Sequence, residues 1–285
     1  MKCVFVTEDK KFVMPGYAKQ LLKFAGLHDD DIMVLDHSAI FRRLYIPQQS
    51  FHLNQYSSAY QVELYSTIAR ICGGGVEKNS VDKIYLSRTK LGAQRTYGEE
   101  TVQHIFEKNG FRIIYPETMS VADQVACVKN CKILAGCAGT ALHLAAFMKP
   151  GGTVIQIKRN SSVDDSSFPQ NLINQTNKLN FVTIWGSVEA RPSKHNTNIP
   201  QIIGVTPYMR KFFDDYGFDY NENDLTHAPE ILEAYDRAMG LYRARTKYTK
   251  LKKSVAKILS RFIPGRKRRH DVYECVKRFL KTYDL

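Results

Sequence analysis

The chain has 285 residues, enough for one large domain or about two ordinary ones. Hydrophobic residues make up 44% and charged residues 24%, which excludes a disordered chain, a collagen-like chain and a polytopic membrane protein. No run approaches the roughly 20 apolar residues that cross a bilayer. Because the start, MKCVFVTEDKK, becomes charged too early for a signal peptide, we expect a cytoplasmic protein.

The net charge of +13 comes from one segment near the C-terminus. Residues 243–269 contain twelve Lys or Arg and no Asp or Glu, which leaves 29 basic and 28 acidic side chains elsewhere. A local excess of this kind indicates an anionic partner for that segment. The six cysteines include no CxxC pair, so we interpret them as small buried thiols and expect no zinc site.

The first predicted domain, residues 1–72, alternates strand and helix patterns. Strands are predicted at 3–7, 32–35 and 44–46, and helices at 16–26 and 60–71. Gly73-Gly74-Gly75 follows, and three consecutive glycines have high backbone freedom and no side chain that packs. We place a domain boundary there.

The second predicted domain, residues 76–187, has the most regular pattern. Its predicted strands are 84–86, 111–115, 132–135, 154–157 and 181–185, and its predicted helices are 99–108, 120–131, 140–148 and 168–177. Strands separated by helical stretches of about ten residues form βαβ units with a parallel sheet and right-handed crossovers. We therefore expect a Rossmann-like α/β architecture.

The third predicted segment, residues 188–285, has two parts. Residues 188–230 are polar and contain four prolines, which predicts loops. From Ile231 the pattern is helical almost to the end, with an interruption at Pro264-Gly265.

Three loops of the second domain carry candidate ligand-binding residues, because ligands of open parallel sheets bind beyond the carboxyl ends of the strands. The first loop is Ser87-Arg88-Thr89-Lys90, with Arg95 beyond it and Glu99-Glu100 opening the next helix. Its cations match a diphosphate, since Arg makes two-point contacts with phosphate oxygens. A solvated loop remains the alternative interpretation.

The other two loops contain a carboxylate and a turn of small residues. Glu117 follows one strand and suits ribose hydroxyls, although it suits an exposed loop equally well. Gly136-Cys137-Ala138-Gly139-Thr140 leads into a helix, whose free N–H groups favour an anion. The turn lacks GxGxxG spacing and is not a dinucleotide fingerprint. His143, one turn later, either faces the same site or packs in the core.

In their order along the chain, residues 84–157 resemble the donor-binding part of glycosyltransferase family 61. The resemblance rests on short motifs at matching places, namely Ser87-Arg88, Arg95, Glu99-Glu100, Gly110-Phe111, Pro116-Glu117, Gln124, the turn from Gly136 to Gly139, Phe147 and Pro150-Gly151. Many members of this family have His before the second glycine of the turn, where this chain has Ala138. The members that it resembles include bacterial enzymes of capsular and exopolysaccharide assembly.

The resemblance implies a GT-B-like fold, in which residues 76–187 bind the nucleotide-sugar and residues 1–72 form a shortened acceptor-side domain. It also implies inverting transfer of a sugar to a glycan or lipid-linked glycan in cell-surface polysaccharide synthesis. No cofactor is implied besides the nucleotide-sugar substrate. A non-catalytic nucleotide-sugar-binding subunit is the alternative, because the first domain is short and the turn lacks the histidine.

The resemblance assigns roles to particular residues. Arg88 and Arg95 would bind the diphosphate together with the backbone at Gly139 and Thr140. The full set of expected donor-binding residues is Arg88, Arg95, Glu99, Glu117, Gln124, Gly136, Gly139 and Thr140. The candidates for the catalytic base are Asp9, beside Glu8, and His37 and His143. The predicted donor domain has no DxD pair, and Asp164-Asp165 and Asp214-Asp215 are expected in loops, so we expect no obligatory metal.

The basic segment has the pattern of an amphipathic helix. Its apolar residues, Tyr248, Leu251, Val255, Ile258, Leu259 and Phe262, form one stripe. The expected membrane-binding residues are Lys250, Lys252, Lys253, Lys257, Arg261, Arg266, Lys267, Arg268 and Arg269. An anionic bilayer suits such a helix; packing of the stripe on the body is the alternative. Nucleic-acid binding is not expected, because zinc and aromatic RNA-binding motifs are missing.

Overall fold

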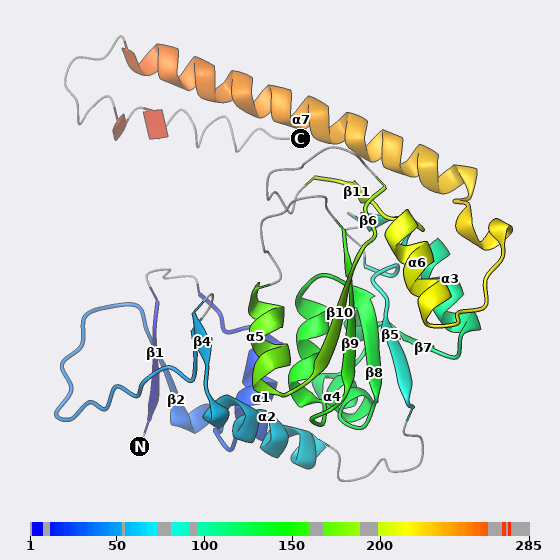
Figure 1. Ribbon diagram of the computed structural model, residues 1–285. Coiled ribbons are helices and arrows are strands. Elements are labelled where there is room, and N and C mark those ends of the chain that lie inside the picture. Colours follow the sequence, from blue (N-terminus) through cyan, green and yellow to red (C-terminus); the bar gives the residue numbers. More distant parts are fainter. Residues whose placement is uncertain are drawn as a thin grey trace. The chain divides into compact units, whose positions relative to one another are not determined.

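The computed structural model describes residues 2–7, 12–52, 55–72, 81–91, 96–159, 168–188, 199–261, 270–271 and 273–274 (Figure 1). Two compact units are present. The first comprises Met1–Asn196 and Gln201–His227, and the second comprises Thr197–Pro200 and Ala228–Leu285. Elements of the predicted domains 1–72 and 76–187 thus fall into one unit. The predicted boundaries at 73–75 and at 188 stay predictions, and residues 73–80 lie outside the described residues.

A five-stranded parallel sheet forms the centre of the first unit (Figure 1). Its strands in chain order are β5 (Lys83–Leu86), β7 (Arg112–Ile114), β8 (Ile133–Cys137), β9 (Thr153–Lys158) and β10 (Asn180–Trp185). In space the order is β10-β9-β8-β5-β7, with parallel pairing throughout. This is the doubly wound order 2-1-3-4-5, in which the strand order reverses between β5 and β8. The predicted parallel α/β sheet is confirmed.

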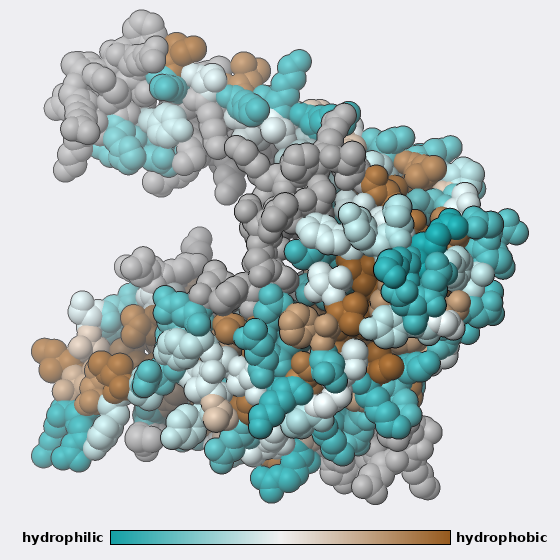
Figure 2. Space-filling model, viewed as in Figure 1, coloured by the Kyte–Doolittle hydropathy of each residue, from teal (hydrophilic) through white to brown (hydrophobic). Residues whose placement is uncertain are grey.

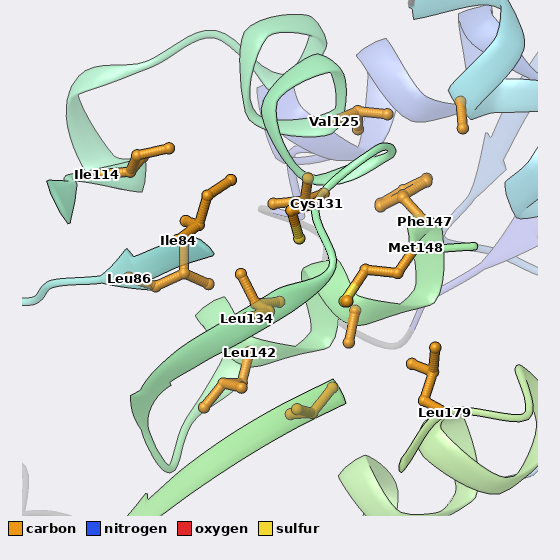
Figure 3. Packing of buried hydrophobic residues seen from close by; sticks show 14 of the residues in the cluster. Ile84, Leu86, Ile114, Val125, Cys131, Leu134, Leu142, Phe147, Met148 and Leu179 are labelled. Carbon is orange, nitrogen blue, oxygen red and sulfur yellow. The ribbon is translucent and has the colours of Figure 1, made fainter. Parts of the chain in front are cut away.

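Five helices of the described residues pack on the sheet and form two hydrophobic cores with it. They are α3 (Glu99–Lys108), α4 (Val121–Val128), the 3-10 helix η3 (Thr140–Phe147), α5 (Phe168–Thr176) and α6 (Pro207–Asp215). All but α6 lie between consecutive strands of the sheet. One core joins the sheet to α4 and η3, with Leu134, Val125 and Phe147 fully or nearly buried (Figure 3). The other joins it to α3 and α6 through Phe106 and Phe213. The chain runs outward from β5 in both directions along the sheet, and right-handed crossovers in opposite directions place their helices on opposite faces. The sheet therefore has one hydrophobic core on each face.

The helix predicted at 140–148 is a 3-10 helix. Such a helix rises about 2.0 Å per residue, against about 1.5 Å in an α-helix. Its buried residues Leu142, Ala145 and Phe147 still pack on the sheet as the apolar pattern indicates.

The prediction that residues 188–230 consist of loops is wrong for α6. Thr206 begins this helix, since its side chain accepts a hydrogen bond of 3.2 Å from Met209 N, and Pro207 takes the first helical position. Met209, Phe212 and Phe213 are buried. Asp214-Asp215, expected in a loop, lies in its last turn. The same segment also contains the 3-10 helix η4 (Glu222–Leu225) and the strand β11 (Gln201–Ile202), which pairs with β6 (Thr96–Tyr97).

The N-terminal part contributes a smaller α/β element. Its elements are β1 (Cys3–Val6), α1 (Gly16–Phe24), the 3-10 helix η1 (Asp29–Asp31), β2 (Ile32–Leu35), the antiparallel pair β3 (Phe51–His52) and β4 (Tyr56–Ser57), and α2 (Ala59–Cys72). β1 and β2 pair in parallel. Ile68 and Ala69 of α2 enter the core shared with α4 and η3.

The strand predicted at 44–46 is wrong. Leu44, Tyr45 and Ile46 are 53%, 69% and 84% exposed and belong to no strand. β-propensity reflects packing against neighbouring strands, and no described strand pairs with this run.

The second unit contains the long helix α7 (Pro229–Arg261), which confirms the predicted helical pattern from Ile231 to Arg261. The predicted interruption at Pro264-Gly265 lies outside the described residues. Among the described residues, no helix has the length and apolar character needed to cross a membrane.

Candidate functional site

The candidate site lies at the carboxyl ends of β5, β8 and β9. Loops that leave neighbouring strands toward opposite faces of a sheet create a ligand-binding position at this point. The residues that meet there are Arg88 after β5, Gly139 after β8, Arg159 after β9 and Glu99 at the start of α3, and we call them the arginine site.

Hydrogen bonds fix the backbone of the loop that carries Arg88. Ser87 N donates to Ile114 O at 2.9 Å, which extends the β5–β7 ladder by one residue. Ser87 Oγ accepts from Thr89 N at 3.2 Å and lies 2.9 Å from Thr89 Oγ1. Arg88 N donates to Glu99 Oε1 at 3.1 Å. The loop is therefore held in place before any ligand binds.

Two guanidinium groups flank Gly139. A methyl group at Gly139 would lie 2.6 Å from Arg88 Nη1 and 3.8 Å from Arg159 Nη2. A side chain at position 139 would displace the Arg88 guanidinium, so glycine permits this close approach of the cation to the backbone. The first residues of η3 follow directly, and the free N–H groups of a first helical turn favour negative charge.

Arg159 was not among the sequence-predicted residues. Its Nη1 donates to Thr96 Oγ1 at 3.1 Å, and its Nε is buried without a hydrogen-bond partner among the described residues. Burial lowers the pKa of Arg159, and the charge of Arg88 acts in the same direction. A buried cation with an unused donor favours a bound anion. The signal in the sequence is its position two residues after the end of the predicted strand 154–157, the same position that Arg88 has after the strand 84–86.

Glu99 is the buried carboxyl group of the site, with 1% of its surface exposed. Its Oε1 accepts from Arg88 N at 3.1 Å and from Tyr85 OH at 3.4 Å. Burial raises the pKa of Glu99 to about 7, although the Arg88 N–H and the charges of Arg88 and Arg159 oppose that rise. The Glu99 carboxyl group is thus shielded from solvent and in direct contact with the backbone of the Arg88 loop.

The remaining predicted donor residues differ in their surroundings. Gly136 lies inside β8, where a methyl group would be 2.9 Å from Leu86 O, so strand packing accounts for this glycine. Thr140 is exposed at the start of η3. Glu117 is exposed in the 3-10 helix η2 (Pro116–Thr118). Arg95 lies outside the described residues.

The amide nitrogen of Gln124 is engaged with backbone. Its Nε2 donates to Pro116 O at 2.8 Å and to Met119 O at 3.2 Å. These bonds hold the loop after β7, so the role of Gln124 in the structure is to support that loop.

Of the three candidate bases, the structure describes His37 and His143, and these two lie in different surroundings. Asp9 and Glu8 lie outside the described residues. His37 is exposed after β2, with its Nδ1 2.8 Å from Asp36 Oδ1. His143 is half-buried on η3 and lines a separate cavity. Within the described residues, no three His, Cys, Asp or Glu side chains lie where they could hold a metal ion.

The basic segment is exposed on α7 as far as the side chains are described. Lys250 and Lys257 are exposed, and so are Tyr248, Leu251 and Ile258, at 52%, 59% and 53%. Figure 2 shows apolar side chains at the surface of this helix among polar ones. The side chains of Lys252, Lys253 and Arg261, and residues 262–269 with Arg266, Lys267, Arg268 and Arg269, lie outside the described residues.

Comparison with known proteins adds one finding. Residues 32–155 match the model of a protein family described as Glycosyltransferase 61. The search of curated proteins found no match. The matched range contains Arg88, Glu99 and Gly139 but ends before Arg159. This match supports the resemblance to glycosyltransferase family 61, and with it a glycosyltransferase activity.

Proposed function

We propose that the chain transfers a sugar from a nucleotide-sugar to a glycan acceptor, with inversion at the anomeric carbon. The observation that carries this proposal is the pair of guanidinium groups at Gly139, placed where the strand order of the sheet reverses. Two cations at one backbone position match the two phosphates of a nucleoside diphosphate.

The chemistry of the transfer follows from this placement. As the bond between the sugar and the diphosphate breaks, negative charge develops on the leaving phosphate, and fixed positive groups stabilise it. Arg88 and Arg159 supply such groups, which is why we propose transfer without an obligatory metal. Inversion needs a base that takes the acceptor proton on the opposite face of the sugar.

We further propose a GT-B-like division of labour. The parallel sheet with its arginine site binds the donor, and the N-terminal elements β1, α1 and β2 belong to the acceptor side. The parallel β1–β2 pair joined through α1 supports this proposal, because it is the repeating unit of an α/β domain. Cell-surface polysaccharide synthesis of the capsular or exopolysaccharide type is the proposed setting.

A panel of nucleotide-sugars tests the proposed function. We expect one of them to raise the melting temperature of the purified protein, since a ligand of the native state stabilises it by mass action. The same donor should release nucleoside diphosphate when glycan acceptors are added. Binding without hydrolysis or transfer would instead support the non-catalytic subunit, and no binding by any donor would contradict both.

We also propose that α7 binds the anionic inner face of a plasma membrane from the cytoplasm, next to a lipid-linked acceptor. Exposed Tyr248, Leu251 and Ile258 lie beside exposed Lys250 and Lys257 on one helix. Apolar side chains that enter the interface, together with roughly 1 kcal/mol for each basic residue near anionic lipid, favour such binding.

Vesicle sedimentation tests the membrane proposal. We expect the protein to sediment with phosphatidylglycerol-containing vesicles and not with pure phosphatidylcholine. Lys250→Glu with Lys257→Glu should weaken sedimentation severalfold. Lys19→Glu with Lys149→Glu, which changes the charge equally at exposed sites of the first unit, serves as the control. Unchanged sedimentation of the α7 variant, or preference for a DNA duplex, would contradict the proposal.

A further inference from the structure

A separate cavity of about 190 Å³ lies among α2, η3, α5 and the β3–β4 pair. None of its lining residues belongs to the arginine site. The residues that matter for its chemistry are Phe51, Ser57, Gln61, Tyr65, His143 and Asn177. A space of this size holds about six water molecules, which is the room that one sugar ring needs.

His143 is a titratable group of the cavity wall, and no described side chain forms a hydrogen bond or ion pair with it. It is half-buried, and burial alone lowers its pKa, with no contribution from a hydrogen bond or a nearby charge. The imidazole is therefore neutral near pH 7, and a ring nitrogen is available to accept a proton.

The rest of the wall combines aromatic rings with amide and hydroxyl groups. The ring of Tyr65 packs edge-on against Phe147 at 4.8 Å between centroids, and Phe51 provides a second ring of the lining. Gln61 Oε1 accepts from Ser50 OH at 2.7 Å, and Gln61 also bonds Tyr65. Asn177 Nδ2 donates to Ala146 O at 2.7 Å, which fixes its amide in place. Apolar rings with a few fixed polar groups are the usual lining of a small-molecule site, and they suit the C–H face and the hydroxyls of a sugar.

The 3-10 helix η3 links the cavity to the arginine site. Gly139 directly precedes η3, and His143 is its fourth residue. At about 2.0 Å per residue, the backbone positions of the two differ by about 8 Å along the helix. This distance is comparable to a sugar ring with its bond to phosphate, so a donor anchored at Gly139 can extend its sugar toward His143.

We propose that this cavity binds the acceptor sugar and that His143 is the catalytic base of the transfer. The proposal rests on the proposed function. The acceptor hydroxyl oxygen forms a bond to the anomeric carbon, whose bond to the diphosphate oxygen breaks. The electron pair of that bond leaves with the nucleoside diphosphate, and the hydroxyl proton moves to a ring nitrogen of His143.

Kinetics of His143→Gln test the base. With the donor that the panel identifies, we expect kcat for transfer to fall by about 10²- to 10⁴-fold, while the donor-induced rise in melting temperature stays unchanged. In the wild type, kcat for transfer should increase with pH over the range in which His143 loses its proton. The variant should not show this increase. His104→Gln, an exposed histidine on α3, is the control. Transfer at the wild-type rate, or loss of donor binding together with transfer, would overturn the assignment of His143.

Saturation-transfer NMR tests the cavity without any activity. Methyl glycosides of glucose, galactose and N-acetylglucosamine serve as probes. We expect at least one to bind the wild type and His143→Gln, and not Ser57→Trp, which fills the cavity while the donor still stabilises the protein. Binding that survives Ser57→Trp, or the absence of binding by all three probes, contradicts the acceptor site. Absence of any donor binding in the earlier panel would contradict the proposed function instead.

Discussion

Replacement of Arg88 by Ala is expected to lower kcat/KM for sugar transfer by about 10²- to 10³-fold, the loss typical of one transition-state donor. Arg159→Ala should have an effect of the same size, because both guanidinium groups flank Gly139. The two groups act on one diphosphate, so the double variant should lose less than the product of the single losses. Steady-state kinetics with the donor that stabilises the protein measure all three values.

The matched control for these variants is Arg112→Ala. Arg112 is exposed and begins β7, so it lies at the opposite end of the strands from the arginine site. Its replacement removes one positive charge without touching the site, and transfer should continue at the wild-type rate. Equal losses in Arg88→Ala and Arg112→Ala would mean that the total charge matters and not the position of the guanidinium groups. Circular dichroism should show that all variants are folded.

Donor affinity is expected to fall as the pH rises through about 7, because Glu99 then becomes ionised. Burial raises the pKa of this carboxyl group to about 7. The charged side chains near it are Arg88, Arg159 and Glu100, and the hydroxyl of Tyr85 and the thiol of Cys137 are also close. Below that pH the neutral acid leaves both arginine charges to the diphosphate. Above that pH the Glu99 carboxylate carries a negative charge that repels the diphosphate. Over about 8 Å, at an effective dielectric constant of about 20, this repulsion weakens binding by about 2 kcal/mol. We expect a decrease of about 10- to 30-fold.

Glu99→Gln isolates this effect. Glutamine keeps an oxygen that accepts from Arg88 N but does not ionise, so the affinity of the variant should stay nearly constant between pH 6 and pH 8. A nucleotide-sugar is the appropriate ligand, since its diphosphate does not titrate in that range. Glu117→Gln, at an exposed carboxylate, should retain the wild-type pH dependence. Parallel curves for the wild type and Glu99→Gln would refute the role of Glu99.

The same residue determines a change of stability with pH. A carboxyl group whose pKa is higher in the folded than in the unfolded protein binds more protons in the folded state, so stability decreases as pH rises. For Glu99 the decrease extends from about pH 4.5 to about 7 and amounts to about 3 kcal/mol. Urea unfolding at pH 5 and pH 8 should show this loss in the wild type and a smaller one in Glu99→Gln.

The strand pattern was the most informative part of the sequence. β-branched runs separated by amphipathic stretches predicted all five strands of the sheet, because burial on both faces requires such runs. The rule that ligands meet strand ends then singled out Arg88 and Gly139. The run 44–46 has the same composition but no strand beside it, and α6 was missed because the prolines of its surroundings predicted loops.

The parallel α/β class, the loop that carries Arg88 and the basic helix could all be predicted from the sequence, since each depends on residues close together in the chain. Three features became visible only in the folded chain: Arg159 lies with Arg88 at Gly139, Glu99 is buried behind the Arg88 loop, and His143 lines a different cavity. In the order β9-β8-β5, the carboxyl ends of β5 and β9 lie at the same end of the sheet, although they are about 70 residues apart in the sequence. That order follows from the packing of helices on both faces of the sheet, which no local pattern contains.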